Sequence, residues 1–256
     1  SVGVLTEMLM AENDKWTEIE HLPLWDEEFY DVYTAKKHGK WVMLKTLKEQ
    51  YRDDPAMKEM IEREFDVRYN LCHPNIVMIN DFEEVPGLGM CIITDDVYGD
   101  SLRKLIDEKK VTDEHLRKVC HELVEAMEYI EANHLVHQPI RPETIQFTEN
   151  VGNLKLIDVG FDQKQSLKPD DVEEDVRQFG QVLTETLDAL DSHNPRLRTI
   201  ARQCMSKGKP HFRSANDLHM ALQGRNNNRL LVWILAFLVV MLSVLAWLSS
   251  GYAPHP

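Results

Sequence analysis

The sequence predicts an α+β protein that carries one membrane-spanning helix near its C-terminal end. Runs typical of strands dominate the first part of the chain, and runs with helical spacing dominate the second part. Residues 230–248 are 19 consecutive residues without a charge. A helix of that length is about 28 Å long, which matches the hydrocarbon core of a bilayer. Trp233 and Trp247 lie near its two ends, where interfacial anchors are found.

The strands are expected between about residues 21 and 48 and again further on. The stretch "DVYTAKKHGKWVMLKTL", residues 31–47, is typical of two strands joined by a turn at His38-Gly39-Lys40. Residues 55–71 have helical spacing, and residues 76–82 and 90–94 predict two more strands. The first 20 residues are acidic and carry no clear pattern.

The second part predicts helices over 101–109 and 113–133, followed by a hairpin of residues 144–147 and 154–158 around Gly152. The remaining residues to about 222 predict mainly helix. We therefore expect the following segments: an acidic segment 1–20, a strand-rich part 21–97, a helix-rich part 98–222, a linker 223–229, a transmembrane helix 230–248 and a short tail 249–256.

Composition excludes some classes of function. Hydrophobic residues make up 43% of the chain, which is enough for a core, and the net charge of −14 argues against nucleic-acid binding, which needs a basic face. The four cysteines form no C-x-x-C pair, which argues against a disulfide framework or a zinc site and suits a reducing compartment.

Flanking charges predict the orientation of the apolar segment. Arg225 and Arg229 precede it, whereas residues 249–256 contain no lysine or arginine. The positive-inside rule therefore places the large N-terminal part in the cytoplasm and the tail outside. The N-terminal residues show no signal-peptide pattern, which favours the same orientation. We expect a bacterial inner-membrane protein, with a tail-anchored eukaryotic protein as the alternative.

Six short motifs follow one another along the chain, and their order and spacing are informative. "WVMLK" ends at Lys45, and "EFDVRYNLCHPNIV" contains Glu64 nine residues before His73. "HQPIRPET" and "IDVGF" come next, and the latter supplies Asp158. "DVRQFG" and "CMSKGKPHFRSANDL" complete the series. In order and spacing these motifs resemble those of protein kinases of the Ser/Thr type over roughly residues 21–222.

The resemblance implies a two-lobed protein-kinase-like fold, with a small β-rich N-lobe and a larger helical C-lobe. It assigns structural roles to His137, Asp175 and Arg213, of which the last two correspond to a buried acid and a buried arginine. It makes Asp158 a candidate Mg²⁺ ligand. The candidate nucleotide-binding residues that it implies are Lys45, Glu64, Asp158, Val32, Asp95 and Val97.

The catalytic loop departs from the family pattern. Pro139 stands where the family has its catalytic aspartate, and proline has no side chain that accepts a proton. The loss of a general base typically costs about 10²–10⁴ in rate. Gln138 replaces the neighbouring arginine, and Thr144 replaces the Mg²⁺-binding asparagine.

The phosphate-binding loop departs as well. Trp25, Glu27 and Tyr30 occupy its three glycine positions, and further carboxylates surround them. Glycine lets a backbone approach phosphates closely, whereas bulky or anionic side chains hinder that approach. In the adenine pocket, Met43 replaces a small alanine and Gln146 replaces an apolar residue.

The parts that switch a kinase on are also altered. Val159 replaces the phenylalanine of D-F-G, and Arg68 stands at a normally apolar position four residues after Glu64. Only 14 residues separate Gly160 from Asp175, and they contain no A-P-E motif. Lys45, Glu64 and Asp158 are retained, either to bind nucleotide or because a lysine–glutamate pair fixes a helix against a strand.

These observations predict a membrane-anchored pseudokinase, a regulatory or scaffolding module that binds protein without phosphotransfer and with weak or no ATP binding. The alternative is a low-activity Ser/Thr kinase or an ATP-binding switch that uses Lys45 and Asp158. We expect no obligatory cofactor, although ATP and Mg²⁺ are the candidates that the family implies. The expected partners are a protein, for example an active kinase, and the membrane through residues 230–248; no nucleic acid is expected.

Overall fold

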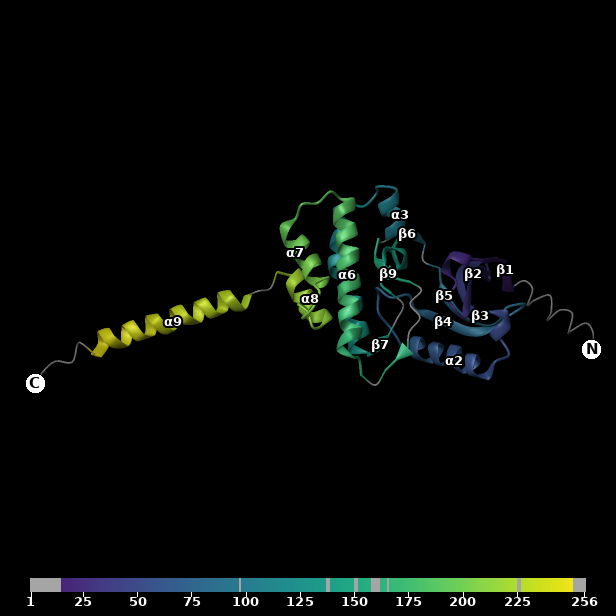
Figure 1. Cartoon of the computed structure of the whole chain (residues 1–256), viewed down its shortest axis with the longest axis horizontal. Helices are drawn as coiled ribbons and strands as arrows, with labels where there is room; N and C mark the ends of the chain where they lie inside the picture. Colours follow the sequence, from purple (N-terminus) through teal and green to yellow (C-terminus); the bar gives the residue numbers. More distant parts are fainter. Residues whose placement is uncertain are drawn as a thin grey trace, which may run out of the picture.

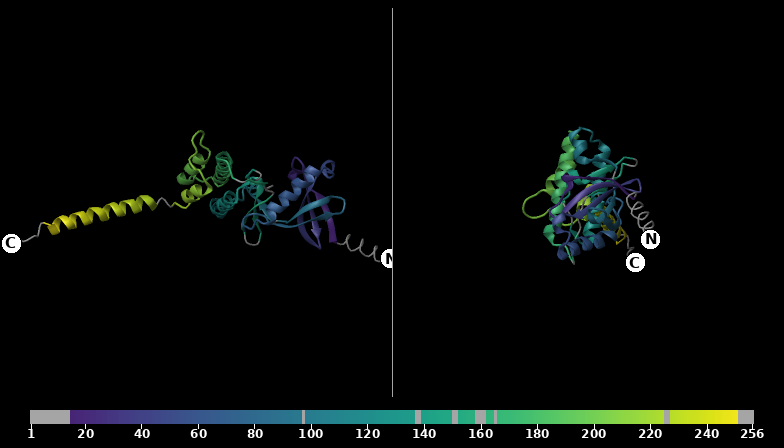
Figure 2. Two further views of the ribbon diagram at one scale, coloured as in Figure 1. Left: turned by 90° about the horizontal axis from the view of Figure 1, so that it is seen from below. Right: turned by 90° about the vertical axis from the view of Figure 1, so that its right-hand side faces the viewer.

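The computed structural model describes residues 15–96, 98–136, 139–149, 152–157, 162–164, 166–224 and 227–250. A five-stranded antiparallel sheet and one α-helix form a small lobe, and helices with a three-stranded and a two-stranded sheet form a larger lobe (Figures 1 and 2). The structure thus confirms the α+β class and the change from strands to helices along the chain.

The small lobe is built on strands β1 (Trp16–His21), β2 (Tyr30–Lys37), β3 (Lys40–Leu47), β4 (Ile79–Val85) and β5 (Gly89–Asp95), in the order β1-β2-β3-β5-β4. The turn between β2 and β3 is the predicted one: His38 and Gly39 both have positive φ, and Lys37 pairs with Lys40. Two consecutive positive φ values suit the twist of a tight hairpin.

Helix α2 (Pro55–Tyr69) packs on the sheet and begins with Asp54, whose carboxylate accepts a bond from Ala56 N–H. Two strands of the sheet begin at other residues than predicted. It begins at Trp16 rather than near residue 21, because the Trp16 side chain is buried with Val42 and Leu44 and anchors β1 at the edge. Strand β4 begins at Ile79 rather than at residue 76.

The large lobe follows the predicted helices. These are α3 (Leu102–Asp107), α4 (Asp113–Lys118), the π-helical segment η3 (Val119–Leu123), α5 (Val124–Ala132), α6 (Pro169–Ala189), α7 (Pro195–Cys204) and α8 (Ala215–Leu222). Strands β6 (Gly99–Ser101), β8 (Ile145–Thr148) and β9 (Leu154–Leu156) form a small sheet, and β7 (Leu135–Val136) pairs with β10 (Asp162–Gln163). One apolar cluster around Phe179 and Leu123 joins these elements.

The apolar helix α9 (Asn227–Ser250) is the last element, drawn in yellow in Figure 1. Its window Val232–Ser249 has a mean hydropathy of 2.5, and none of that window is buried within the structure. By length and composition this helix is able to cross a membrane.

Candidate functional site

The candidate site lies between the two lobes, around the ammonium group of Lys45 on β3. Its Nζ donates to Glu64 Oε1 of α2 over 3.0 Å. Both side chains are buried, with 7% and 9% of their surface exposed. The structure thus brings together the lysine and the glutamate that the sequence selected, and their pairing ties α2 to the sheet.

A second carboxylate reaches the same lysine. Glu27, at one of the former glycine positions, accepts from Lys45 Nζ with both oxygens, at 2.9 and 3.0 Å. The ring of Tyr30, at another of these positions, lies 4.4 Å from Nζ and adds a cation–π contact. The sequence had suggested only that Glu27 would repel phosphate; in the structure it takes the lysine that would hold phosphate.

The loop that carries Glu27 is held in place by its own hydrogen bonds. Asp26 accepts from Val32 N–H at 3.0 Å and contacts His21 Nε2 at 2.9 Å. The N–H of Glu27 donates to the carbonyl of Tyr30 at 3.0 Å. These contacts within the loop position Glu27 so that its carboxylate reaches Lys45.

Arg68 extends this group into a row of alternating charges. Its Nη1 donates to Glu64 Oε1 at 3.2 Å, and only 5% of the side chain is exposed. The order is Glu27, Lys45, Glu64 and Arg68, so that each buried charge has an opposite neighbour. Two carboxylates also surround Tyr30, and burial, followed by Glu64 and Glu27, raises the pKa of its phenol, which stays neutral.

The space beside Lys45 is small. It is lined by Val32, Met43, Leu44, Lys45, Arg68, Val77, Ile92, Thr94, Asp95 and Ile157, and it measures about 30 Å³. This is room for one or two water molecules. Trp25, from the third former glycine position, packs against Val77 and Ile157 at the edge of this space.

Comparison with known proteins places this geometry in a family. Residues 28–182, more than half of the chain, match the model of the protein kinase domain. The chain belongs to the protein kinase family. Among its relatives is "Serine/threonine-protein kinase 36" of Pongo abelii, 29% identical over 141 residues, which are 54% of this chain and 10% of that protein.

Two plant proteins are similar to the same extent. "Serine/threonine-protein kinase TIO" of Arabidopsis thaliana is 27% identical over 142 residues, 54% of this chain and 10% of that protein. "CBL-interacting serine/threonine-protein kinase 5" of the same plant is 29% identical over 136 residues, 52% of this chain and 30% of that protein. The chain therefore spans about a tenth to a third of the length of these relatives.

A kinase domain ordinarily uses ATP and Mg²⁺, and two features of the described residues oppose the binding of ATP. The lysine that would hold its phosphates is paired with two carboxylates, and the adenine region has a volume of about 30 Å³. Asp95, a candidate for contact with the base, is paired with Lys40 at 2.7 Å and with Asn80 at 2.6 Å.

The catalytic loop of this kinase fold is organised around its own backbone. Thr144, at the Mg²⁺-binding position, is 1% exposed, and its hydroxyl donates to the carbonyl of Arg141 and accepts from the N–H of the same residue. The hydroxyl is therefore used in hydrogen bonds within the loop. Pro139, at the position of the catalytic base, is exposed.

Sequence reasoning missed one residue that anchors this loop. Gln178 of α6 is buried and accepts from Ile140 N–H at 2.8 Å, while its own amide donates to Glu174. Asp175, to which the resemblance assigns a structural role, lies half-buried on the same helix, and that role stays a prediction. The sequence signal for Gln178 is its position one turn after Asp175.

Other predicted residues lie elsewhere than expected. Arg213, expected to be buried, is exposed, because it lies just before α8, where its backbone N–H donates to Asp217 in the first turn of that helix. Gln146 lies on β8 opposite Ser101 and does not line the small cavity. Val97, His137, Gln138, Asp158 and Val159 lie outside the described residues.

Proposed function

We propose that this protein is a membrane-anchored pseudokinase, a regulatory or scaffolding module that binds protein and does not transfer phosphate. The observation that carries the proposal is the contact of both Glu27 oxygens with Lys45. A carboxylate of the protein itself binds the lysine ammonium group. In an active kinase this group binds phosphate oxygens.

The cost of nucleotide entry follows from this contact. ATP would have to displace Glu27 from Lys45 and move Trp25 away from Val77 and Ile157. The displaced carboxylate would then lie beside the triphosphate, where like charges repel. Thr144 and Pro139 offer neither a metal ligand directed into the cleft nor a proton acceptor.

The role of such a domain is recognition. An apolar helix able to span a bilayer supports attachment to a membrane, and the two arginines before it support a cytoplasmic position of the kinase-like domain. The layout of a Ser/Thr-kinase-like domain with a single span suits a bacterial inner membrane, and a tail-anchored eukaryotic protein is the alternative. A domain held there without catalysis serves to recruit or restrain a protein. The kinase fold makes an active kinase the first candidate by analogy.

A second function has one observation in its favour. The Lys45–Glu64 pair is formed, and it is the pair that an active kinase assembles. A low-activity kinase or an ATP-binding switch that used Lys45 and Asp158 would need Glu27 to swing away from the lysine.

Thermal unfolding of the full chain in detergent micelles separates these functions. We would compare millimolar ATP with Mg²⁺, ATP with EDTA, and no nucleotide. A bound ligand at 100 times its Kd adds about 2.7 kcal/mol, or about 5–10 °C for a domain of this size. The pseudokinase predicts no shift and no ATP turnover. A shift of several degrees that Lys45→Ala abolishes would contradict the closed site and favour the switch, and turnover would favour the enzyme.

A further inference from the structure

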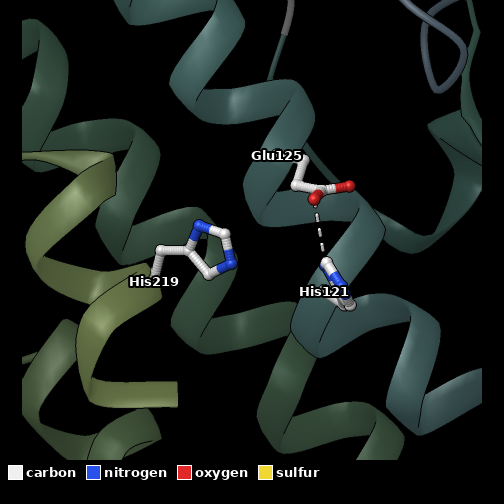
Figure 3. A group of neighbouring side chains, drawn as sticks. All are labelled: His121, Glu125 and His219. Carbon is white, nitrogen blue, oxygen red and sulfur yellow. Dashed lines mark ion pairs between the residues drawn. The ribbon is translucent and has the colours of Figure 1, made fainter. Parts of the chain in front are cut away.

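Three polar side chains of the large lobe meet where α8 packs on the preceding helices. His121 of η3, Glu125 of α5 and His219 of α8 each place a nitrogen or oxygen atom within 4.8 Å of the others. Figure 3 shows the imidazole of His219 directed toward the His121–Glu125 pair on the neighbouring helix. None of these residues lines the small cavity beside Lys45.

We propose that His121, Glu125 and His219 form a binding site for a divalent transition-metal ion, with zinc as the ion that suits them. Two imidazoles and one carboxylate are a ligand set that zinc accepts, with water in the fourth position. Hard ions such as Mg²⁺ and Ca²⁺ prefer oxygen ligands alone. The four cysteines, whose spacing argued against zinc, take no part in this site.

The distances support this assignment. His121 Nδ1 lies 3.3 Å from Glu125 Oε1. Two ligands of a tetrahedral zinc ion at 2.0–2.1 Å lie about 3.3 Å apart, so this pair already has the separation that zinc requires. The two residues are four apart on one helical face, and His219 completes the set from a second helix. Its ligand atom lies within 4.8 Å of the other two, so a small inward shift of the three side chains would let them share one ion.

A carboxylate behind the ligands fixes the orientation of His219. Glu128 Oε2 lies 2.9 Å from His219 Nδ1, which leaves Nε2 as the nitrogen for the metal. Zinc-binding histidines usually have such a partner on their second nitrogen. Gln223 Nε2 contacts His219 Nε2 at 2.6 Å, and the metal replaces this contact.

The local backbone and the surface also fit a site. His121 lies in the π-helical segment η3, and single π-turns inside α-helices are frequent at functional sites. An adjoining hollow of about 410 Å³, lined in part by Cys120, His121 and His219, gives an ion and its water access from solvent.

A second group of His and Asp side chains is less suited to a metal, because its central carboxylate already has partners. His21, Asp26 and Asp31 also lie close together. Both oxygens of Asp26 already contact His21, and one of them also accepts from Val32 N–H. That group is explained by its role in holding the loop of Glu27.

Metal binding would join α8 to α5. Helix α8 is the last element before the residues that lead to α9, so the ion would brace the end of the domain that faces the apolar helix. This inference does not depend on the proposed pseudokinase function, because none of its residues contacts Lys45, Glu27 or Trp25.

Calorimetric titration of the EDTA-treated full chain in micelles with ZnCl₂ tests the site, with Co²⁺ absorption as a second readout of tetrahedral coordination. We expect one ion per chain, and loss of binding in Glu125→Gln and in His219→Ala. Glu128→Gln should weaken binding about 10–100-fold, as removal of an outer-shell partner does. His193→Ala, an exposed histidine of the same lobe, should bind as the unmodified chain does.

Melting of each variant in EDTA shows that it is folded, and Glu125 is exposed enough for its substitution to be tolerated. Zinc should raise the melting temperature of the unmodified chain and of His193→Ala, raise that of Glu128→Gln less at the same zinc concentration, and leave those of Glu125→Gln and His219→Ala unchanged. Absence of zinc binding to the unmodified chain, or equal binding by Glu125→Gln and His219→Ala, would overturn the proposal. The cluster would then be a set of surface ion pairs.

Discussion

The contact between Glu27 and Lys45 can be tested by the substitution Glu27→Gln, which keeps the size of the side chain and removes its charge. Opposite unit charges 2.9 Å apart attract by about 6 kcal/mol at an effective dielectric constant of 20. Desolvation of the two charges offsets much of this attraction. Loss of one partner of a buried ion pair costs about 3–5 kcal/mol when the other partner is left unpaired. Lys45 keeps Glu64, so we expect a loss of about 1–3 kcal/mol.

A loss of that size corresponds to a fall of about 2–12 °C in melting temperature for a domain of 150–250 residues. Urea unfolding at 25 °C gives the free energy directly. Glu28→Gln is the matched control, because Glu28 is exposed, makes no ion pair with the described residues, and its substitution removes the same charge. Its free energy of unfolding should change by less than about 0.5 kcal/mol.

The substitution should also free Lys45 for an anion. Glu27→Gln should therefore show a larger ATP-dependent rise in melting temperature than the unmodified chain, while Glu28→Gln should not. If Glu27→Gln melts at the same temperature as the unmodified chain and gains no response to ATP, Glu27 does not hold Lys45. The argument that Glu27 takes the place of a phosphate would then be refuted.

Three further outcomes follow from the structure. Gln178→Ala leaves the buried Ile140 N–H without its acceptor and should lower the free energy of unfolding by about 1–3 kcal/mol, measured in urea; a change below 0.5 kcal/mol would contradict the anchoring role. Burial raises the pKa of Glu83, but bonds to two lysines outweigh it and hold the pKa below 4.5. The carboxylate therefore stabilises the fold above about pH 4.5 and loses this effect as pH falls further, so Glu83→Gln should cost about 1 kcal/mol at pH 7 and nothing near pH 2, and an equal cost at both would refute it. Leu238→Arg places a charge in the middle of α9 and adds about 2.5–3.5 kcal/mol to the free energy of membrane insertion, so it should move the chain from the membrane fraction to the soluble fraction. Leu230→Arg, near the end of the helix, should have a smaller effect on this distribution.

Much of the fold could be predicted because its signals are local. The hairpin at His38 and Gly39 follows from residues that adopt positive φ, and helix α2 follows from helical spacing after Asp54 and Pro55. The limits of β1 could not be predicted, since Trp16 becomes part of the sheet only through a core formed by distant strands. The same holds for Arg213, whose exposure depends on how α8 is placed.

The sequence by itself determined which chemical groups are present: a lysine and a glutamate at kinase positions, a proline in place of the base, and bulky or acidic residues in place of glycines. Only the tertiary structure decided that Glu27 turns toward Lys45. That direction depends on a turn closed by Asp26 and on the packing of Trp25 across the cleft, contacts between residues up to 132 positions apart. Spacing along a chain determines which residues share an element, whereas the meeting of two charges requires the elements to be packed.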